Sequence, residues 1–401
     1  MRKKVLVLTP RFPYPGFGGD RMRIHQLCSA LAKKYDLVLV SICQSKAELE
    51  QTLPIDAPFI EAHKVFLPKW QSYIQTIMAV IAGKSLQIAY YRSNQFSKKV
   101  DAILSVNKFD LVVCHLARVA PYAKSFLGVK ILELSDYLPL TYSRAMLVNG
   151  NRNSLKSLAY RFEGQRIDAA QNQLASDFDL ISFVSEVDAG LFQKSSGIAF
   201  DRIATYPMGI SLNDKPCLTN RSGKIIVFIG NIKTLQNRDA VSYFSRHVWP
   251  IILSAHPDAE FKIIGDIDES FKNELSSLPR IIVTGRVQLI SEETRDCTIG
   301  VCPVRVAAGI QVKILDYMAL GLPTVATSFG AEGLQITDKI GIRIANTPED
   351  FAGCVISLLS NSTERESISR YARGIVECSY SYQATDSKFQ AIIDKLLLTP
   401  H

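Results

Sequence analysis

The sequence lacks any apolar run long enough to cross a membrane as a helix, which takes roughly 18 apolar residues. Its basic start is followed by an apolar run that ends at Pro10, and this run is too short for the core of a secretory signal peptide. We interpret it as a first buried strand. We therefore expect a cytoplasmic protein that is at most peripheral on the inner face of the plasma membrane.

Metal-binding and disulfide patterns are also missing. None of the eight cysteines forms a C-x-x-C pair, and most lie within apolar runs, which favours buried free thiols in a reducing compartment. The net charge is +8, but the basic residues form no dense run, so we expect no nucleic-acid partner. The surplus of positive charge fits either a solvated surface or a partner that carries phosphates, such as a nucleotide-sugar or an anionic lipid.

What the sequence does contain is an alternation of short β-branched runs with longer helical patterns. The runs cover residues 4–9, 37–42, 110–114, 130–134 and 180–184, and then 224–230, 260–265, 280–285, 299–303 and 323–327. Continuous apolar strands separated by helices predict parallel sheets covered on both faces. A turn-rich stretch at 208–224 predicts the boundary between two doubly wound α/β domains. Because such sheets bind ligands beyond the carboxyl ends of their strands, we expect a ligand cleft where the two sheets face each other.

The first loop after a predicted strand contains two adjacent glycines. Gly18 and Gly19 precede a helix that we expect to begin near Arg21, with Asp20 as its cap. Glycines here let the backbone approach a phosphate or a hydroxyl, and the free N–H groups of a helix start favour an anion. The spacing is not that of the dinucleotide fingerprint G-x-G-x-x-G, and a merely flexible loop is the alternative interpretation.

The most informative segment is 301–334. A strand is followed by Arg305, by a loop that contains Gly309, and by a helix expected from about Gln311. Two cations, Arg305 and Lys313, beside a helix start suit a pyrophosphate group. Asp316 lies one helical turn after Lys313 and could accept hydrogen bonds from ribose hydroxyls, although an Asp–Lys surface pair is the more common arrangement.

Residues 303–323 read P-x-R-x-x-x-G-x-x-x-K-x-L-D-x-M-A-x-G-x-P, which resembles the donor-binding signature of glycosyltransferase family 4. Further similarity covers residues 11–23, 115–122, 183–192 and 230–244, and extends to G-A-E-G-L at 330–334. The resemblance implies the GT-B fold, with two Rossmann-like, doubly wound parallel-sheet domains facing across a cleft. We assign residues 1–208 to an acceptor-binding domain and 209–385 to a donor-binding domain. Residues 386–401 are assigned to a helix that returns to the first domain.

The resemblance also implies an activity. Family members are retaining, metal-independent transferases, so we expect a hexosyltransferase-type enzyme of bacterial surface-polysaccharide or exopolysaccharide synthesis. Its co-substrate would be a nucleotide-diphosphate-sugar and its acceptor a glycan or a lipid-linked molecule, with no cofactor and no metal. Asp266 and Asp268 superficially resemble a D-x-D metal motif, but we interpret them as a surface turn.

Residue roles follow from the same resemblance. The expected catalytic residues are His115, which would lie near the transferred sugar, and Arg305 and Lys313, which would stabilise the leaving diphosphate. The expected donor-binding residues are Gly18, Gly19, Gly230, Asn231, Asn237, Gly309, Ile310, Gln311 and Asp316. The expected acceptor contacts are Asp20, Arg21, Arg118, Tyr122 and Asp136.

Three departures from the family pattern keep other functions open. Ala308 stands where the first acid of the family's E-x7-E motif falls, only Gly209 remains of an N-G-V-D segment, and Asn231 and Asn237 replace an Arg and a Glu-Lys. A degenerate nucleotide-sugar-binding scaffold and a GT-B epimerase are therefore the alternatives.

One further segment has two interpretations. Residues 64–84 combine aromatic and aliphatic residues at helical spacing with lysines at both ends. They could form an interfacial helix that contacts an anionic membrane carrying a lipid-linked acceptor, or a helix packed on the first domain.

Overall fold

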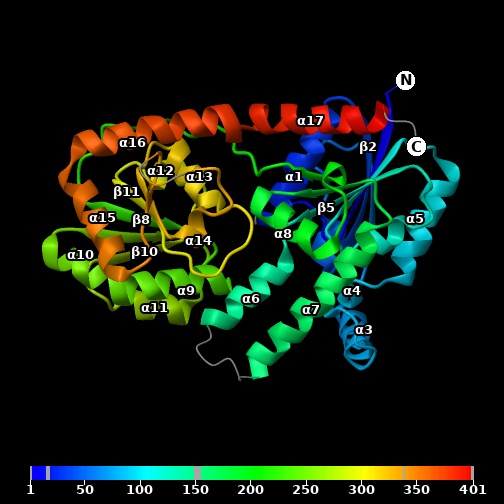
Figure 1. The fold of residues 1–401 in the computed structure, drawn as a ribbon, viewed down its shortest axis with the longest axis horizontal. Coiled ribbons are helices and arrows are strands. Elements are labelled where there is room, and N and C mark those ends of the chain that lie inside the picture. The colour runs from blue at the N-terminus through cyan, green and yellow to red at the C-terminus, as the bar shows by residue number, and fades with distance from the viewer. Residues whose placement is uncertain (1, 15–18, 149–154, 337, 339, 399–401) are drawn as a thin grey trace. The chain divides into compact units, whose positions relative to one another are not determined.

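The computed structural model describes residues 2–14, 19–148, 155–336, 338 and 340–398. Its chain divides into two compact units, Met1–Pro207 with Asp386–His401, and Met208–Thr385 (Figure 1). Each unit contains one sheet with helices around it, and all strand pairs in both sheets are parallel. The predicted architecture of two doubly wound parallel sheets is therefore confirmed.

The first unit is built on a seven-stranded sheet of order β3-β2-β1-β4-β5-β6-β7. Its strands are β1 (Lys4–Thr9), β2 (Asp36–Cys43), β3 (Glu61–Phe66), β4 (Leu111–His115), β5 (Val129–Ser135), β6 (Leu180–Phe183) and β7 (Ile203–Thr205). Its helices are α1 (Gly19–Ala32), α2 (Lys46–Glu50), α3 (Lys69–Ile81), α4 (Leu86–Tyr90), α5 (Asn94–Val106), α6 (Leu138–Val148), α7 (Leu155–Ala175) and α8 (Glu186–Ser196). Short 3-10 turns cover Ala120–Ala123 and Phe200–Arg202. The last helix, α17 (Tyr382–Leu398), belongs to this unit from Asp386 onward.

The second unit is built on a six-stranded sheet of order β10-β9-β8-β11-β12-β13. Its strands are β8 (Ile225–Ile229), β9 (Glu260–Ile264), β10 (Ile281–Gly285), β11 (Ile299–Cys302), β12 (Thr324–Ala326) and β13 (Arg343–Ile344). Its helices are α9 (Leu235–Tyr243), α10 (Trp249–Ala255), α11 (Glu269–Ser276), α12 (Ile290–Glu293), α13 (Val312–Ala319), α14 (Ser328–Ala331), α15 (Pro348–Ser360) and α16 (Ser362–Ile375). π-Helical turns cover Phe244–Val248 and Val376–Tyr380.

The central strands are apolar along their whole length because both faces of each sheet are covered. Alternate residues of β1, such as Leu6 and Val7, enter separate apolar clusters on opposite faces of the first sheet, and both are fully buried. In β8, Phe228 and Val227 do the same in the second unit. This explains why unbroken apolar runs, rather than alternating ones, marked these strands in the sequence.

Each sheet reverses its strand order next to its first strand. β1 lies between β2 and β4, and β8 lies between β9 and β11. The loops that follow β1 and β4, and those that follow β8 and β11, therefore diverge at the carboxyl ends of the strands and leave room for a ligand. Among the helices of the described ranges, none combines the length and the apolar character that crossing a bilayer would require.

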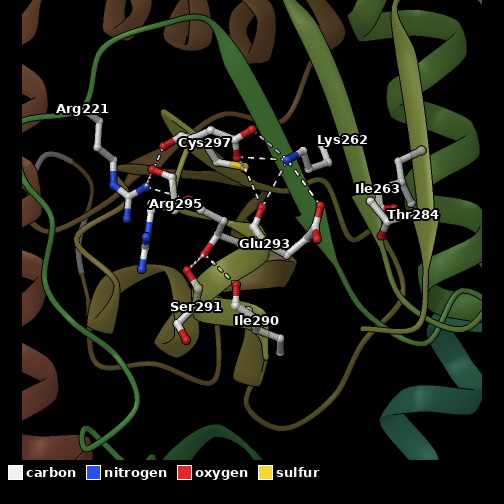
Figure 2. Close-up of polar contacts among 11 residues, drawn as sticks. Arg221, Lys262, Ile263, Thr284, Ile290, Ser291, Glu293, Arg295 and Cys297 are labelled. Carbon is white, nitrogen blue, oxygen red and sulfur yellow. Dashed lines mark hydrogen bonds and ion pairs between the residues drawn. The ribbon is translucent and has the colours of Figure 1, made fainter. Parts of the chain in front are cut away.

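A buried arginine fastens the predicted linker to the second unit. Arg221 donates to the carbonyl oxygen of Cys297 at 2.8 Å (Figure 2). It also donates to the carbonyl oxygens of Thr294, at 2.7 Å, and of Leu320 at the end of α13, at 2.8 Å. The buried Lys262 of β9, labelled in the same close-up, pairs with Asp296 at 2.9 Å. These contacts fix one end of α13, whose other end begins the candidate donor site.

Candidate functional site

The second unit places two amide side chains, those of Asn237 and Gln311, against one buried lysine at the carboxyl ends of β8 and β11. The Lys313 ammonium donates to Asn237 Oδ1 at 3.0 Å and to Gln311 Oε1 at 3.1 Å. Asn237 Nδ2 in turn donates to the carbonyl oxygen of Asn231 at 2.9 Å. A Cβ on Gly230 would lie 2.9 Å from Asn237 Nδ2, so a glycine is needed where the loop passes this side chain. The structure thus brings five sequence-predicted residues together.

The charge of Lys313 is poorly compensated. The side chain is 8% exposed, and burial lowers the pKa of its ammonium group. Both oxygens that accept its hydrogen bonds belong to neutral amides, and its Nζ lies 5.2 Å from the centroid of the Phe228 ring. A buried cation without a bonded carboxylate is a favourable place for an anionic ligand, because the ligand would supply the missing charge.

The loop before α13 is held by close backbone packing. Gly309 adopts a positive φ of 69°. A Cβ on Gly333 would lie 2.1 Å from the carbonyl oxygen of Gly309 and 3.1 Å from Ile310 Cα, so only glycine permits this approach. Gln311 occupies the N-cap position of α13. The loop therefore presents the free N–H groups of the helix start in a fixed position beside Lys313.

Arg305 lies in the same loop but is already paired. Its Nε and Nη2 donate to Asp239 of α9 at 3.1 and 2.6 Å, and its guanidinium stacks 4.4 Å from the centroid of the Tyr243 ring. Its side chain is 39% exposed, so a ligand can reach it without breaking the pair. Asp239 fixes the direction of Arg305, and the sequence analysis did not identify this partner.

Asp316 lies on α13 after Lys313 and forms an ion pair with Lys215 of the linker at 3.7 Å. Burial raises the pKa of its carboxyl group to about 6, against the opposing effect of Lys215. The carboxylate is thus positioned by a residue of the linker that the sequence analysis did not single out.

The first unit contains a buried network at the carboxyl ends of β4 and β5. Glu133 Oε1 accepts from Arg23 Nε at 3.0 Å, and Glu133 Oε2 lies 2.6 Å from His115 Nδ1. The backbone N–H of Ser135 also donates to Glu133, at 3.1 Å. Burial opposes ionisation of Glu133, but Arg23 and His115 outweigh it and hold the pKa of its carboxyl group at about 2. The ionised carboxylate then accepts the Nδ1–H of His115.

His115 has a second ring nitrogen, the buried Nε2, which has no hydrogen-bond partner among the described residues. The next residue, Leu116, has a φ of +68°, and Ser135 after β5 has a φ of +60°, both unusual for residues other than glycine. Strained backbone at the ends of two adjacent strands is typical of a functional site.

A pocket adjoins this network, because Ser135 belongs to both. It is lined by Asp20, Gln87, Leu116, Ala117, Arg118, Leu134, Ser135, Asp136, Leu138, Ile167 and Gln171. Three of the predicted acceptor contacts, Asp20, Arg118 and Asp136, therefore share one pocket. His115 lies beside the pocket and does not line it. Arg118 is oriented by Gln87 of α4, whose Oε1 accepts its Nη2 at 2.8 Å.

Two polar side chains of the pocket wall, those of Gln171 and Asp136, are poorly accommodated by the described residues around them. Gln171 of α7 is 1% exposed, and in the part of the chain that is described neither its Oε1 nor its Nε2 has a hydrogen-bond partner. Burial and the nearby acids Asp188 and Glu133 raise the pKa of the Asp136 carboxyl group to about 7. Unsatisfied polar groups in a pocket wall favour a ligand that carries hydroxyl groups.

Other sequence-predicted residues lie elsewhere. Arg21 pairs with Glu48 at 2.7 Å, and the Tyr122 hydroxyl donates to the Tyr91 carbonyl oxygen at 2.8 Å, so neither lines the pocket. Gly19 is the first residue of α1, which begins two residues earlier than expected, so Asp20 lies in its first turn rather than at its cap. Gly18 lies outside the described residues.

The acids of the D-x-D sequence are occupied by neighbouring cations. Asp266 pairs with Lys233 at 2.9 Å and Asp268 with Arg238 at 3.1 Å. In the described ranges, no cluster of three or more His, Cys, Asp or Glu side chains is arranged to hold a metal ion.

Three residues of the site, Arg23, Glu133 and Gln171, were not expected from the sequence. Glu133 had a usable signal, because it is the one acid within the apolar run 129–135 and a buried strand tolerates an acid only when it is paired. Arg23 lies on the apolar face of α1, which is a similar signal. Nothing near Gln171 in the sequence distinguishes it from the other amides of α7.

Comparison with known proteins supports the resemblance seen in the sequence. Residues 223–361 match the family model of glycosyl transferases group 1. The chain is also 23% identical, over 398 residues, to an uncharacterised 44.6 kDa protein of the cps region of Klebsiella pneumoniae, with 94% of this chain and 96% of that protein covered.

Solved structures show the same GT-B fold over the whole chain. Sucrose-phosphate synthase from Thermosynechococcus elongatus superposes with a TM-score of 0.72 at 11% identity, covering 98% of this chain and 99% of that one. HepE from Anabaena, in complex with UDP-glucose, gives 0.68 at 12% identity, covering 98% and 99%. TarM from S. aureus, in complex with fondaparinux, alpha-GlcNAc-glycerol and UDP, gives 0.68 at 10% identity, covering 99% and 100%.

Proposed function

We propose that this protein is a retaining, metal-independent glycosyltransferase that moves a hexose from a nucleotide-diphosphate-sugar to a glycan or lipid-linked acceptor in surface-polysaccharide synthesis. The match of 223–361 to group 1 transferases and the cps-region relative support the reaction class and the pathway. HepE and TarM, which bind UDP-glucose and UDP, support the nature of the donor. The observation that carries the proposal is Lys313, a buried cation whose hydrogen bonds within the described residues go to neutral amides.

The second unit would bind the donor. As the bond between the sugar and the diphosphate breaks, negative charge develops on the leaving group. Lys313, the exposed edge of Arg305 and the N–H groups at the start of α13 would stabilise that charge, which is why the proposal includes no metal ion. Asp316 would accept hydrogen bonds from the ribose, with Lys215 holding it in place.

The first unit would bind the acceptor. The pocket offers hydroxyl-binding groups on Asp136 and Gln171 and a cation on Arg118, which suits a sugar acceptor or one that carries a phosphate. His115 would interact with the transferred sugar through Nε2, since its Nδ1 is held by Glu133. A peripheral contact with an anionic membrane completes the proposal.

Thermal-shift measurements against UDP-, GDP-, ADP-, CMP- and dTDP-sugars test the donor assignment. We expect one nucleotide class to stabilise the wild-type protein and the Lys313→Ala variant to lose that stabilisation. Absence of a shift with every class would contradict the proposal.

Ala308 supports one competing function, a nucleotide-sugar-binding scaffold, because it replaces an acid that family members use to contact the donor sugar. Slow hydrolysis of the donor in the absence of acceptor separates the two. A transferase releases free sugar at a rate that Lys313→Ala abolishes, whereas a scaffold binds the donor and leaves it intact.

A further inference from the structure

Helix α3 carries a continuous apolar stripe that faces solvent. Its members recur at the i, i+3, i+4 and i+7 spacing of one helix face, and each side chain is between 48% and 84% exposed. They are Trp70, Tyr73, Ile74, Ile77, Met78 and Ile81. We call this set the α3 stripe. Figure 1 shows α3 beside α4 in the first unit, away from the strands of the sheet.

The orientation of α3 is the reverse of that expected for a helix packed on a core. Its fully buried residues are Ser72 and Ala79, which lie on the opposite face. Ser72 Oγ accepts a hydrogen bond from Gln44 Nε2 at 3.3 Å, so the inward face is small and partly polar. An amphipathic helix in a soluble protein normally buries its apolar face, which means that the stripe is shaped for contact with something outside the chain.

The surroundings of the stripe are positively charged. Residues 62–100 contain no Asp or Glu. Lys69 and Lys84 lie at the two ends of α3, and they are exposed, as are Arg92 and Lys98. Lys64, by contrast, is bonded to the carbonyl oxygens of the 48–51 segment and does not belong to this set.

We propose that the α3 stripe inserts into the surface of an anionic membrane, with Lys69 and Lys84 at the level of the lipid phosphates. Large apolar side chains flanked by cations and free of acids match a bilayer interface, where acyl chains accept the stripe and head groups accept the lysines. Pairing with a second copy would bring like charges together, so this occupant is disfavoured. With 13 residues the helix is about 20 Å long, which fits a helix lying in the interface rather than across it.

The position of the stripe connects it to the pocket of the first unit. α3 packs on α4, where the Tyr73 and Tyr90 rings meet at 6.0 Å, and α4 carries Gln87 into the pocket wall. The membrane contact thus adds to the proposed function, on which one consequence rests: an acceptor bound in the pocket would come from the membrane surface and be carried by a lipid.

Vesicle flotation with the full chain tests the proposal. The vesicles contain phosphatidylethanolamine with one-third phosphatidylglycerol, or phosphatidylcholine alone. We compare wild type, the stripe variant Ile74→Gln/Ile77→Gln/Ile81→Gln, and the control variant Ile55→Gln/Leu127→Gln/Phe200→Gln, which changes three exposed apolar residues elsewhere. Wild type and control should bind the anionic vesicles, and the stripe variant should bind them at least about tenfold more weakly.

Tryptophan fluorescence locates the contact. The chain has two tryptophans, of which Trp249 is buried and Trp70 belongs to the stripe. Anionic vesicles should shift the emission to the blue in wild type, and Trp70→Phe should abolish the shift while binding persists. A stripe variant that floats like wild type would overturn the proposal. Absence of wild-type flotation, with or without self-association through the stripe, would overturn it as well.

The membrane contact and the proposed function can fail independently. Donor binding is measured in the absence of vesicles, and the stripe variant should retain the wild-type thermal shift with the nucleotide-sugar. Flotation without donor binding would reject the transferase and keep the membrane contact, and donor binding without flotation would do the reverse.

Discussion

Two buried lysines of the second unit differ in what compensates their charge. Lys262 pairs with Asp296 at 2.9 Å and Glu293 at 3.4 Å, and although burial opposes its charge, these acids raise its pKa (Figure 2). Lys313 is bonded to two amide oxygens, and burial lowers its pKa. The comparison teaches that burial alone does not mark a ligand site. The informative feature is a buried charge that is hydrogen-bonded to no carboxylate among the described residues.

The sharpest test of this comparison is the pair Lys313→Met and Lys262→Met. If Lys313 awaits a diphosphate, its loss should lower donor turnover by roughly 1,000-fold, as for other residues that stabilise developing charge. Lys262→Met should destabilise the second unit, because it leaves Asp296 and Glu293 without their cation, yet leave donor turnover of the folded protein unchanged. Turnover is measured as sugar release from the nucleotide-sugar. Equal losses in both variants would show that the two lysines are both structural.

Arg305 lies between these extremes, because Asp239 compensates it and its edge remains exposed. We therefore expect Arg305→Ala to lower turnover less than Lys313→Met does. A larger loss in Arg305→Ala would reverse the assignment of the two cations.

Two acids at the end of β5, Glu133 and Asp136, also differ in whether neighbouring cations compensate their charge. Glu133 is held by Arg23 and His115, and the pKa of its carboxyl group is about 2, below its ordinary value of 4.5. Its ionised form therefore stabilises the fold above pH 4.5, and this stability is lost as the pH falls toward 2. We expect Glu133→Gln to cost roughly 3 kcal/mol at pH 7, since a buried pair is broken. Urea unfolding between pH 7 and pH 3 measures the difference, which should shrink as the pH falls.

Asp136 should behave in the opposite way. Its pKa of about 7 lies above the ordinary 3.8, so the folded protein holds a proton that the unfolded chain releases, and stability falls as the pH rises through this window. We expect Asp136→Asn to raise stability at pH 8 by about 1 kcal/mol, or about 2–4 °C, and to change nothing at pH 4. Melting curves at the two pH values test this. Destabilisation at pH 8 would mean that a partner compensates the carboxylate.

Much of the fold followed from the sequence, because buried parallel strands are unbroken apolar runs. β3 was missed since it is an edge strand, where Glu61, His63 and Lys64 interrupt the apolar pattern, and β13 was missed because it has two residues. In the segment 64–84, the spacing of the apolar residues predicted a helix, but it did not predict whether the apolar face of that helix is buried or exposed. Sequence periodicity shows that a helix has an apolar face and does not show whether the protein covers it.

The residues of the candidate donor site were predictable from the sequence, but their mutual contacts were not. Lys313, Gln311 and Asn237 were all expected to bind the donor, yet Asn237, which accepts a hydrogen bond from Lys313, lies 76 residues away from it in the sequence. The contrast between Lys313 and Lys262 depends on which oxygens the fold brings near each ammonium group. Such pairings are long-range, so compensation of charge becomes visible only in the structure.

The smallest expected effect extends the comparison to uncharged groups. Gln171 and Gln26 are both buried amides of the first unit, but Gln26 Nε2 donates to the Pro207 carbonyl oxygen at 3.3 Å, whereas neither polar atom of Gln171 has a partner within the described ranges. Because an unmade buried hydrogen bond costs free energy, Gln171→Leu should stabilise the protein by up to about 1 kcal/mol, and Gln26→Leu should destabilise it. Urea unfolding measures both.

The rate of sugar transfer to the acceptor provides a second test of the role of Gln171. If the Gln171 amide hydrogen-bonds a hydroxyl group of the acceptor, Gln171→Leu should slow transfer to the acceptor. Hydrolysis of the donor in the absence of acceptor should stay at the wild-type rate. A gain in stability together with a loss of transfer would place Gln171 with Lys313 and Asp136, among the groups that we propose to bind a ligand. A loss of stability would instead show that Gln171 already has a partner in solution, such as a buried water, and would remove it from that set.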